Sequence, residues 1–110
     1  MEENSKFFPF QVGLNENQYK YFADLFKLDE KTIKKINPFI HRSTAMEAIM
    51  NDQIIKFRKQ NPPLPYSDII AELADFHDMK IQATKVKFIK IRAKNRKQWE
   101  RLGLYDEKAL

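Results

Sequence analysis

The chemistry that this sequence offers is concentrated in one basic segment, KVKFIKIRAKNRKQWERLG, at residues 85–103. Lysines and arginines alternate there with apolar residues, and Glu100 is the single acidic residue among them. Regularly spaced cations on a helix are typical of proteins that neutralise the phosphates of a nucleic acid. This segment is therefore the first candidate site, and the remaining elements have to position it.

The net charge of +5 conceals an uneven distribution along the 110 residues. Residues 1–79 contain ten basic and twelve acidic residues, whereas residues 80–101 contain nine basic residues and one acidic residue. A concentrated block of charge creates a local potential that a uniformly basic chain would not have. The sequence thus predicts one cationic surface, which suits a polyanion.

Helical spacing divides the basic segment into three rows. At 100° per residue, a core face is expected to contain Ile81, Phe88, Ile91, Trp99 and Leu102. A second row of lysines and Arg101 lies more than about 100° away from this face. A third sector contains Val86, Ile89 and Ala93, which predicts that the helix also contacts protein on a second side.

The basic residues are expected to have two roles. Phosphate contacts are predicted for Lys85, Lys87, Lys90, Lys94, Lys97 and Arg101. Contacts to base edges are predicted for Arg92, Asn95 and Arg96, because arginine can bridge guanine and asparagine can pair with adenine through two hydrogen bonds.

The apolar spacing and the capping residues predict an all-α chain of about five helices. Asn15 with Gln18 and Thr44 with Glu47 resemble capping boxes, and Gly103 suits the residue that follows a helix. The expected organisation is an N-terminal arm at residues 1–14, a single helical domain at 15–104 and a tail at 105–110. The domain comprises a helical hairpin at 15–37 and a tri-helical unit at 43–103, which ends in the long basic helix.

The tri-helical order resembles helix-turn-helix domains, in which the last helix enters the major groove. KNRKQW, at residues 94–99, is similar to the end of the third helix of a homeodomain. Arg92 and Ala93 stand where that family has an aromatic pair, so the resemblance is one of geometry.

The hairpin YKYFADLFKLDEKTIKKI resembles the compact helix-turn-helix of phage repressors and Cro-like proteins. Ala23 takes the small position of that pattern, and Lys27 stands where a turn glycine is common. The resemblance implies a second candidate reading helix, and packing or dimerisation is the alternative role. Its contacting residues would be Lys31, Thr32, Lys34, Lys35 and Asn37.

The composition argues against several other classes. No cysteine is present and only two glycines occur, which argues against thiol-bound metals and Gly-rich phosphate loops. His41 and His77 lack the spacing of metal ligands, so no cofactor, metal or enzymatic activity is expected. The start of the chain lacks the features of a signal peptide, and no apolar stretch approaches about 20 residues. An intracellular, soluble protein of the cytoplasm or nucleoid, without a membrane partner, is expected.

The resulting hypothesis is a small protein that binds double-stranded DNA, either as a transcriptional regulator or as an accessory factor in packaging or replication. The alternative is a protein-interaction adaptor, in which FFPFQVGL and the hairpin dock a partner. A homodimer is compatible with both, and an RNA-binding subunit of a larger assembly is a subordinate alternative.

Overall fold

The structure is a computed structural model that describes residues 12–108. The chain forms two compact units, Met1–Ile49 and Met50–Leu110, whose boundary falls inside a helix. The described part contains six α-helices and one 3-10 helix, and its only β-type pairing is an isolated bridge between Val12 and His41. The all-α fold class is confirmed, and the predicted arm at residues 1–14 lies largely outside the described residues.

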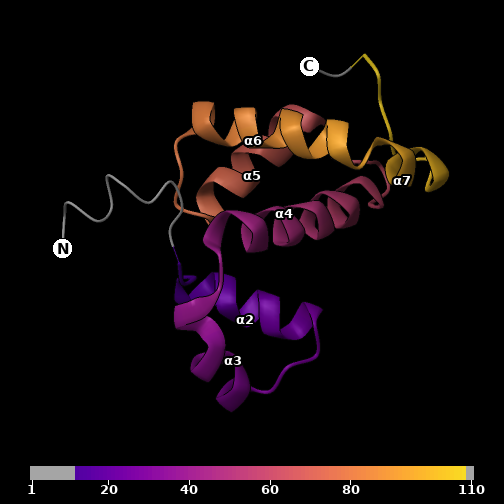
Figure 1. Ribbon diagram of the computed structural model, residues 1–110. Coiled ribbons are helices and arrows are strands. Elements are labelled where there is room, and N and C mark those ends of the chain that lie inside the picture. The colour runs from indigo at the N-terminus through magenta and orange to yellow at the C-terminus, as the bar shows by residue number, and fades with distance from the viewer. Residues whose placement is uncertain (1–11, 109–110) are drawn as a thin grey trace. The chain divides into compact units, whose positions relative to one another are not determined.

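The first unit contains α2 (Glu16–Leu25), α3 (Glu30–Ile36), the 3-10 helix η1 (Asn37–Phe39) and the start of α4 (Arg42–Arg58) (Figure 1). The predicted capping box of α2 is present. Gln18 N donates to Asn15 Oδ1 over 2.9 Å, and Asn15 N donates to Gln18 Oε1 over 3.0 Å. These two bonds satisfy backbone donors that the start of a helix would leave unpaired.

Asp29 caps α3 in the same way, because its Oδ1 accepts a 2.7 Å hydrogen bond from Thr32 N. Hydrogen bonding from Thr32 to the charged carboxylate lowers the pKa of Asp29. The small core of this unit contains Leu14, Ala23, Ile33, Ala45, Met46 and Ile49.

The second unit contains the end of α4, α5 (Tyr66–Phe76), α6 (Ile81–Lys94) and α7 (Arg96–Arg101). Helix α5 packs along α6 (Figure 1). Three fully buried rings from α5, α6 and α7 form an aromatic cluster, with centroid distances of 5.0 Å from Tyr66 to Phe88 and 6.0 Å from Phe88 to Trp99. Trp99 also donates from Nε1 to Asn51 Oδ1 over 2.8 Å, so its one polar atom is paired.

Two helices begin earlier than the sequence predicts. Helix α4 begins at Arg42, and the ring of His41 takes the capping position, where Nδ1 lies 2.8 Å from Thr44 Oγ1 and accepts from Thr44 N at 3.3 Å. Helix α5 begins at Tyr66, directly after Pro65, although serine is a preferred capping residue and Ser67 would place the start two residues later. Periodicity identifies these helices, but it does not identify their first residue.

The long basic helix predicted up to Leu102 is two helices. Asn95 leaves the helical conformation, with φ −109° and ψ 17°, and separates α6 from α7. Its Nδ2 donates back to Ile91 O over 2.9 Å. Asparagine side chains compete in this way with the helix backbone, which explains an interruption at this residue. No helix of residues 12–108 combines the length and the apolar character needed to cross a bilayer.

Three helices end with the same turn, in which one residue adopts a positive φ. In α2, Leu28 N donates to Ala23 O over 2.8 Å and Lys27 N donates to Asp24 O over 3.3 Å, which is the Schellman pattern. The same pairs of bonds recur after α5 and after α7. The residues with positive φ are Lys27 (56°), Asp78 (53°) and Gly103 (72°). The predicted role of Gly103 is therefore confirmed, and Lys27 adopts the turn conformation that usually favours glycine.

Lys27→Gly is expected to raise the free energy of unfolding by up to about 1 kcal/mol, because glycine adopts positive φ without the steric cost of a Cβ atom. Denaturant titration measures this change. Lys20→Gly, the same substitution within α2, is the matched control and should lower the free energy by about 1 kcal/mol. An equal loss in both variants would show that Lys27 is not strained.

One buried histidine connects α5 to the end of α4. Nε2 of His77 lies 2.8 Å from Oε1 of Gln53, and both side chains are buried. Burial lowers the pKa of His77 to about 4, and the charge of Lys87 acts in the same direction. The ring is therefore neutral in the folded protein at neutral pH.

Because the pKa of His77 is lower in the folded chain than in the unfolded chain, the unfolded chain binds more protons between about pH 6.5 and pH 4. The stability contributed by this site should be complete above pH 6.5 and should decrease by at most about 1.4 kcal/mol per pH unit as the pH falls towards 4. Denaturant unfolding at several pH values measures this slope. His77→Gln should have a smaller slope than the wild-type protein, because it removes the ring that titrates.

Candidate nucleic-acid interface

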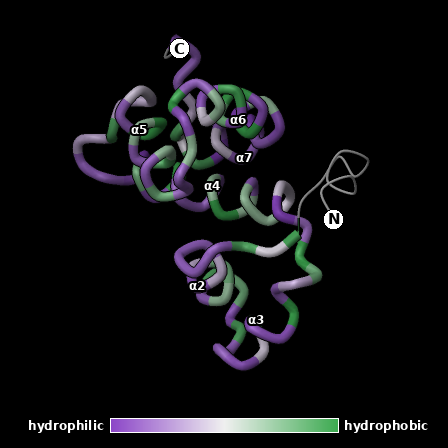
Figure 2. The backbone as a smooth tube through the Cα atoms, turned by 90° about the vertical axis from the view of Figure 1, so that its left-hand side faces the viewer, coloured by the Kyte–Doolittle hydropathy of each residue, from purple (hydrophilic) through white to green (hydrophobic). Residues whose placement is uncertain are grey.

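Helices α6 and α7 hold the cationic surface. Helix α6 contains five basic residues and no acidic residue, and α7 contains three basic residues and Glu100. Figure 2 shows hydrophilic and hydrophobic residues alternating around α6. Lys87 is half-buried, and it takes part in interactions within the chain, as do Lys90 and Lys94. The exposed residues of the predicted phosphate-contacting set are Lys85, Lys90, Lys94, Lys97 and Arg101.

Arg92, predicted to contact a base edge, is engaged within the chain instead. Its guanidinium donates from Nη2 to the carbonyl oxygens of Asp106, over 2.8 Å, and Glu107, over 3.2 Å. It also lies 4.8 Å from the ring centroid of Tyr105 and 5.6 Å from that of Tyr66. Arg92 therefore fastens the C-terminal segment to α6 and is not available for the bidentate contact to guanine that the sequence suggested.

Arg96 also makes contacts within the chain. Its Nε lies 3.2 Å from Glu100 Oε2, Nη2 lies 3.7 Å from Glu107 Oε1, and the guanidinium lies 4.8 Å from the centroid of Tyr105. The hydrogen bond with Glu100 raises the pKa of Arg96. Arg96 is exposed, but two acidic side chains and one ring already surround it, which weakens its case as a base-contacting residue.

Asn95, the third predicted base-contacting residue, is half-buried and uses its amide nitrogen on Ile91 O. Its position between α6 and α7 gives it a structural role, because it ends one helix and precedes the next.

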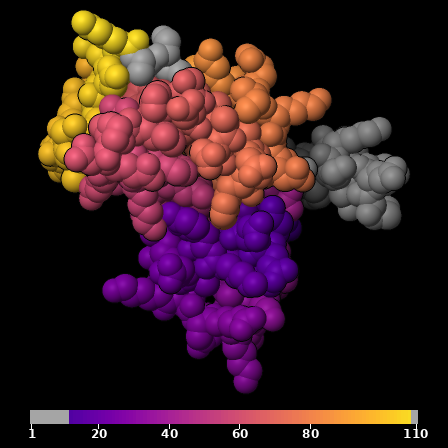
Figure 3. Space-filling model, turned by 180° about the vertical axis from the view of Figure 1, so that it is seen from behind, coloured from indigo at the N-terminus to yellow at the C-terminus, as the bar shows by residue number. Residues whose placement is uncertain are grey.

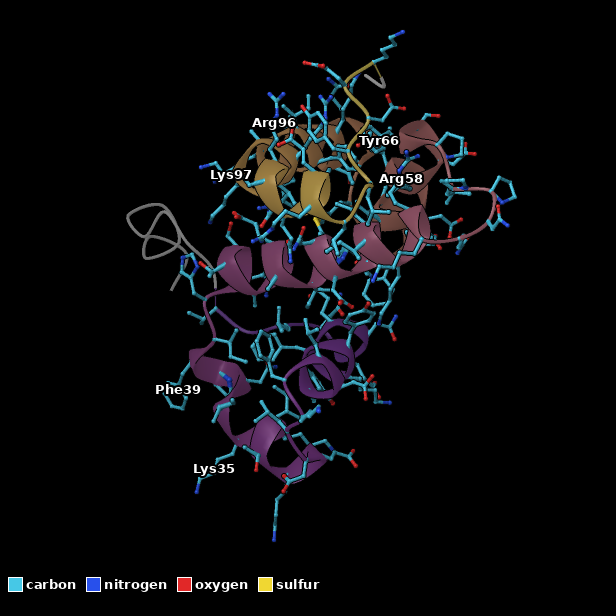
Figure 4. The ribbon with its side chains drawn as sticks, turned by 90° about the vertical axis from the view of Figure 1, so that its right-hand side faces the viewer. Lys35, Phe39, Arg58, Tyr66, Arg96 and Lys97 are labelled. Carbon is cyan, nitrogen blue, oxygen red and sulfur yellow. The ribbon has the colours of Figure 1, made fainter. Side chains whose placement is uncertain are left out.

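Within the segment expected as a tail, residues 105–108 are attached to the second unit. Asp106 N donates to the hydroxyl of Tyr66 over 2.9 Å. Arg58 donates to Leu64 O over 2.9 Å and lies 4.9 Å from the Tyr66 centroid. Figure 4 shows Arg58 and Tyr66 close together beside this segment. Residues 109 and 110 lie outside the described part.

The side of α6 opposite the core carries exposed apolar residues. Phe88 and Ile91 are buried as predicted, but Ile81 and Leu102, expected on the same core face, are exposed. Val86 is 62% exposed and Ile89 is 47% exposed. The protein contact predicted for the sector of Val86, Ile89 and Ala93 is therefore not made by the described residues of this chain.

The second candidate reading helix, α3, keeps only part of its predicted set. Lys31, Thr32 and Lys35 are exposed, and Figure 4 shows Lys35 pointing away from the unit. Lys34 pairs with Glu30 at 3.1 Å, which raises the pKa of Lys34. Asn37 accepts from Leu14 N over 2.9 Å and donates to Leu14 O over 3.0 Å, so its amide is used to hold the chain before α2.

For the outer side of α6, the sequence predicted a contact with protein at Val86, Ile89 and Ala93, and it did not single out Gln82. Gln82, Val86, Ile89 and Ala93 are all exposed, at spacings of three and four residues. The available signal was their position opposite Phe88 and Ile91 in a helix without acidic residues. The described residues contain no group of three or more acidic or histidine side chains that could hold a metal ion.

Arg92→Ala is expected to lower the free energy of unfolding by about 1–3 kcal/mol, because it removes charge-assisted hydrogen bonds and two ring contacts. Arg92→Lys should also be destabilising, since an ammonium group lacks the planar fork of donors. Lys85→Ala, at an exposed position of the same helix, is the control and should change stability by less than about 0.5 kcal/mol. Equal stability of all variants would contradict the structural role of Arg92.

Comparisons of this chain with protein-family models, with curated proteins and with solved structures found no match.

Proposed function

We propose that this chain binds double-stranded DNA through α6 and α7. The observation that carries the proposal is the exposure of lysines on two edges of a helix that contains no acidic residue. A helix has about the diameter that the major groove admits, and lysine ammonium groups suit phosphates as point charges. Figure 3 shows α6, in orange, at the surface with projecting side chains.

The charge of the two units supports the choice of α6 over α3. The second unit contains thirteen basic and eight acidic residues, whereas the first contains seven of each. The capping residue of α6 is Lys80, and the first turn of this helix contains no acidic residue. Asp29 and Glu30 stand at the corresponding end of α3, where they would repel a phosphate.

The involvement of Arg92 and Arg96 within the chain changes the expected binding mode. Phosphate contacts by the exposed cations would supply most of the affinity, and such contacts carry no sequence information. We therefore expect the chain to bind duplex DNA of any sequence, and contacts with bases would add a preference for particular sequences. This mode is compatible with a packaging or replication accessory factor and with a regulator.

A protein-binding role is the second candidate, and it is favoured by the apolar surface of the first unit. Phe39 is 84% exposed and Figure 4 shows it pointing outward, while Phe26 is also exposed. Large aromatic side chains exposed in this way are frequent at protein interfaces. A stoichiometric protein that co-purifies with the chain, without absorbance from nucleic acid, would favour this candidate.

A salt-series titration with a duplex of random sequence tests the DNA proposal. With five phosphate contacts, the slope of log K against log salt should be about −4.5, so affinity should fall about 500-fold between 50 and 200 mM salt. Lys97→Ala should weaken binding and make the slope shallower by about 1, because it removes one phosphate contact. Figure 4 shows Lys97 projecting from α7.

Lys35→Ala, on α3, is the matched control and should leave both affinity and slope unchanged. A larger effect of Lys35→Ala than of Lys97→Ala would assign DNA binding to α3. Binding that is absent, or insensitive to salt, would overturn the proposal.

A further inference from the structure

The outward side of α6 combines apolar residues with cations in a symmetrical arrangement. Four exposed residues lie within about 60° of one another around the helix, and we name them the outer stripe: Gln82, Val86, Ile89 and Ala93. Lys85 lies about 70° to one side of the centre of the stripe, and Lys90 lies about 70° to the other side. The stripe is thus bordered by positive charge on both sides.

We infer that the outer stripe faces the floor of the DNA major groove and favours A·T base pairs there. This inference rests on the proposed function, and it supplies the base contacts that Arg92, Asn95 and Arg96 are not placed to make. A helix in the major groove presents its central row to base edges and its two borders to the two phosphate backbones. In α6 the outer stripe would be the central row, and Lys85 and Lys90 would be the two borders.

The residue types in the stripe indicate which bases are favoured. Thymine presents a methyl group in the major groove, and apolar side chains such as those of Val86 and Ile89 can cover it. Glutamine can pair with adenine N6 and N7 through two hydrogen bonds, which gives Gln82 the complementary role. Ala93 is small, so it allows the helix to approach the bases closely. No residue of the stripe carries a guanidinium for guanine.

The length of the stripe also fits a duplex. Eleven residues separate Gln82 from Ala93, which corresponds to about 16 Å along a helix. This distance spans about five base pairs at 3.4 Å each. The minor groove is only about 6 Å wide, and the major groove of duplex RNA is too narrow for side chains to read, so B-form DNA is the polyanion that fits.

Other occupants fit the stripe less well. A second copy of α6 would bring lysines of both chains together, and like charges at close range repel. A protein helix flanked by acidic residues satisfies the charges, but the stripe offers only two large apolar side chains and no aromatic anchor. Duplex DNA offers phosphates to Lys85 and Lys90 and thymine methyl groups to Val86 and Ile89 at the same time.

Removal of the thymine methyl group tests the inference without changing the protein. Three duplexes of equal length are compared by titration at one salt concentration: alternating A and T, alternating A and deoxyuridine, and alternating G and C. The wild-type chain should bind the thymine duplex about threefold to tenfold more tightly than the deoxyuridine duplex, and the G·C duplex should be weaker still.

Three variants at exposed positions separate the contributions of the stripe and of the lysines. Ile89→Ser should reduce the ratio of thymine to deoxyuridine affinity to about 1, whereas Lys90→Ala should weaken all three duplexes equally and keep the ratio. The wild-type chain should bind more weakly when 7-deazaadenine replaces adenine, because that base lacks N7. Gln82→Ala should bind both duplexes equally, because it lacks the amide that pairs with N7. Denaturant unfolding of each variant confirms that it is folded.

The possible failures can be distinguished. If no duplex binds, the proposed function fails and the inference fails with it. If all duplexes bind with the expected salt dependence but the wild-type ratio is 1, the inference alone fails. A competition experiment uses a synthetic helical peptide with an apolar row flanked by glutamates. If this peptide displaces DNA from the wild-type chain but not from Ile89→Ser, the stripe binds a protein partner and the inference is overturned.

Discussion

The burial of three aromatic rings determines which side of α6 faces the solvent. Tyr66, Phe88 and Trp99 come from three helices and are almost completely buried against one another. Because Phe88 must point into this cluster, the residues about half a turn away must point outward. Those residues are the outer stripe, so the most exposed apolar surface of α6 follows from the packing of its most buried ring. The five basic residues of α6 repel one another, and exposure to water lowers the cost of that repulsion.

The same cluster also holds the C-terminal segment and, through it, the arginines. The hydroxyl of Tyr66 accepts from Asp106 N, and the carbonyl oxygens of residues 106 and 107 accept from Arg92. Arg92 and Arg96 thus make contacts inside the unit, while Lys85, Lys90, Lys94 and Lys97 remain exposed. Lysine suits phosphate better than it suits a base edge, because its ammonium group has no planar fork of donors. The cationic surface is therefore suited to general attraction, and specificity has to come from other side chains.

Much of the fold could be predicted from local patterns, and the differences have identifiable causes. The cap of α2 at Asn15, the cap of α3 at Asp29 and the turn at Gly103 each depend on residues no more than five positions apart, so the sequence displays them directly. Asn95 was read as part of a helix because periodicity averages over many residues and does not register one side chain that bonds back to the backbone. The engagement of Arg92 could not be foreseen, since its partners are backbone carbonyls 14 and 15 residues away, and carbonyls leave no signature in a sequence.

The two units differ in the charge and pairing of their exposed side chains. This difference bears on the two regions that resemble helix-turn-helix proteins, the hairpin in the first unit and the basic helices in the second. In the first unit, Lys34 is paired with Glu30, the amide of Asn37 is bonded to Leu14, and the exposed surface includes Phe39. Three properties of α3 thus oppose a role in reading DNA: an acidic start, a paired lysine and an amide in structural use. In the second unit, α6 contains no acidic residue, and its first turn is therefore not acidic. The hairpin keeps two packing features of the phage-repressor resemblance, since Ala23 is buried and Lys27 has the positive φ of its turn. The exposed cations of α6 support the proposal that this helix binds a polyanion, and the exposed ring of Phe39 supports a protein contact as the second candidate.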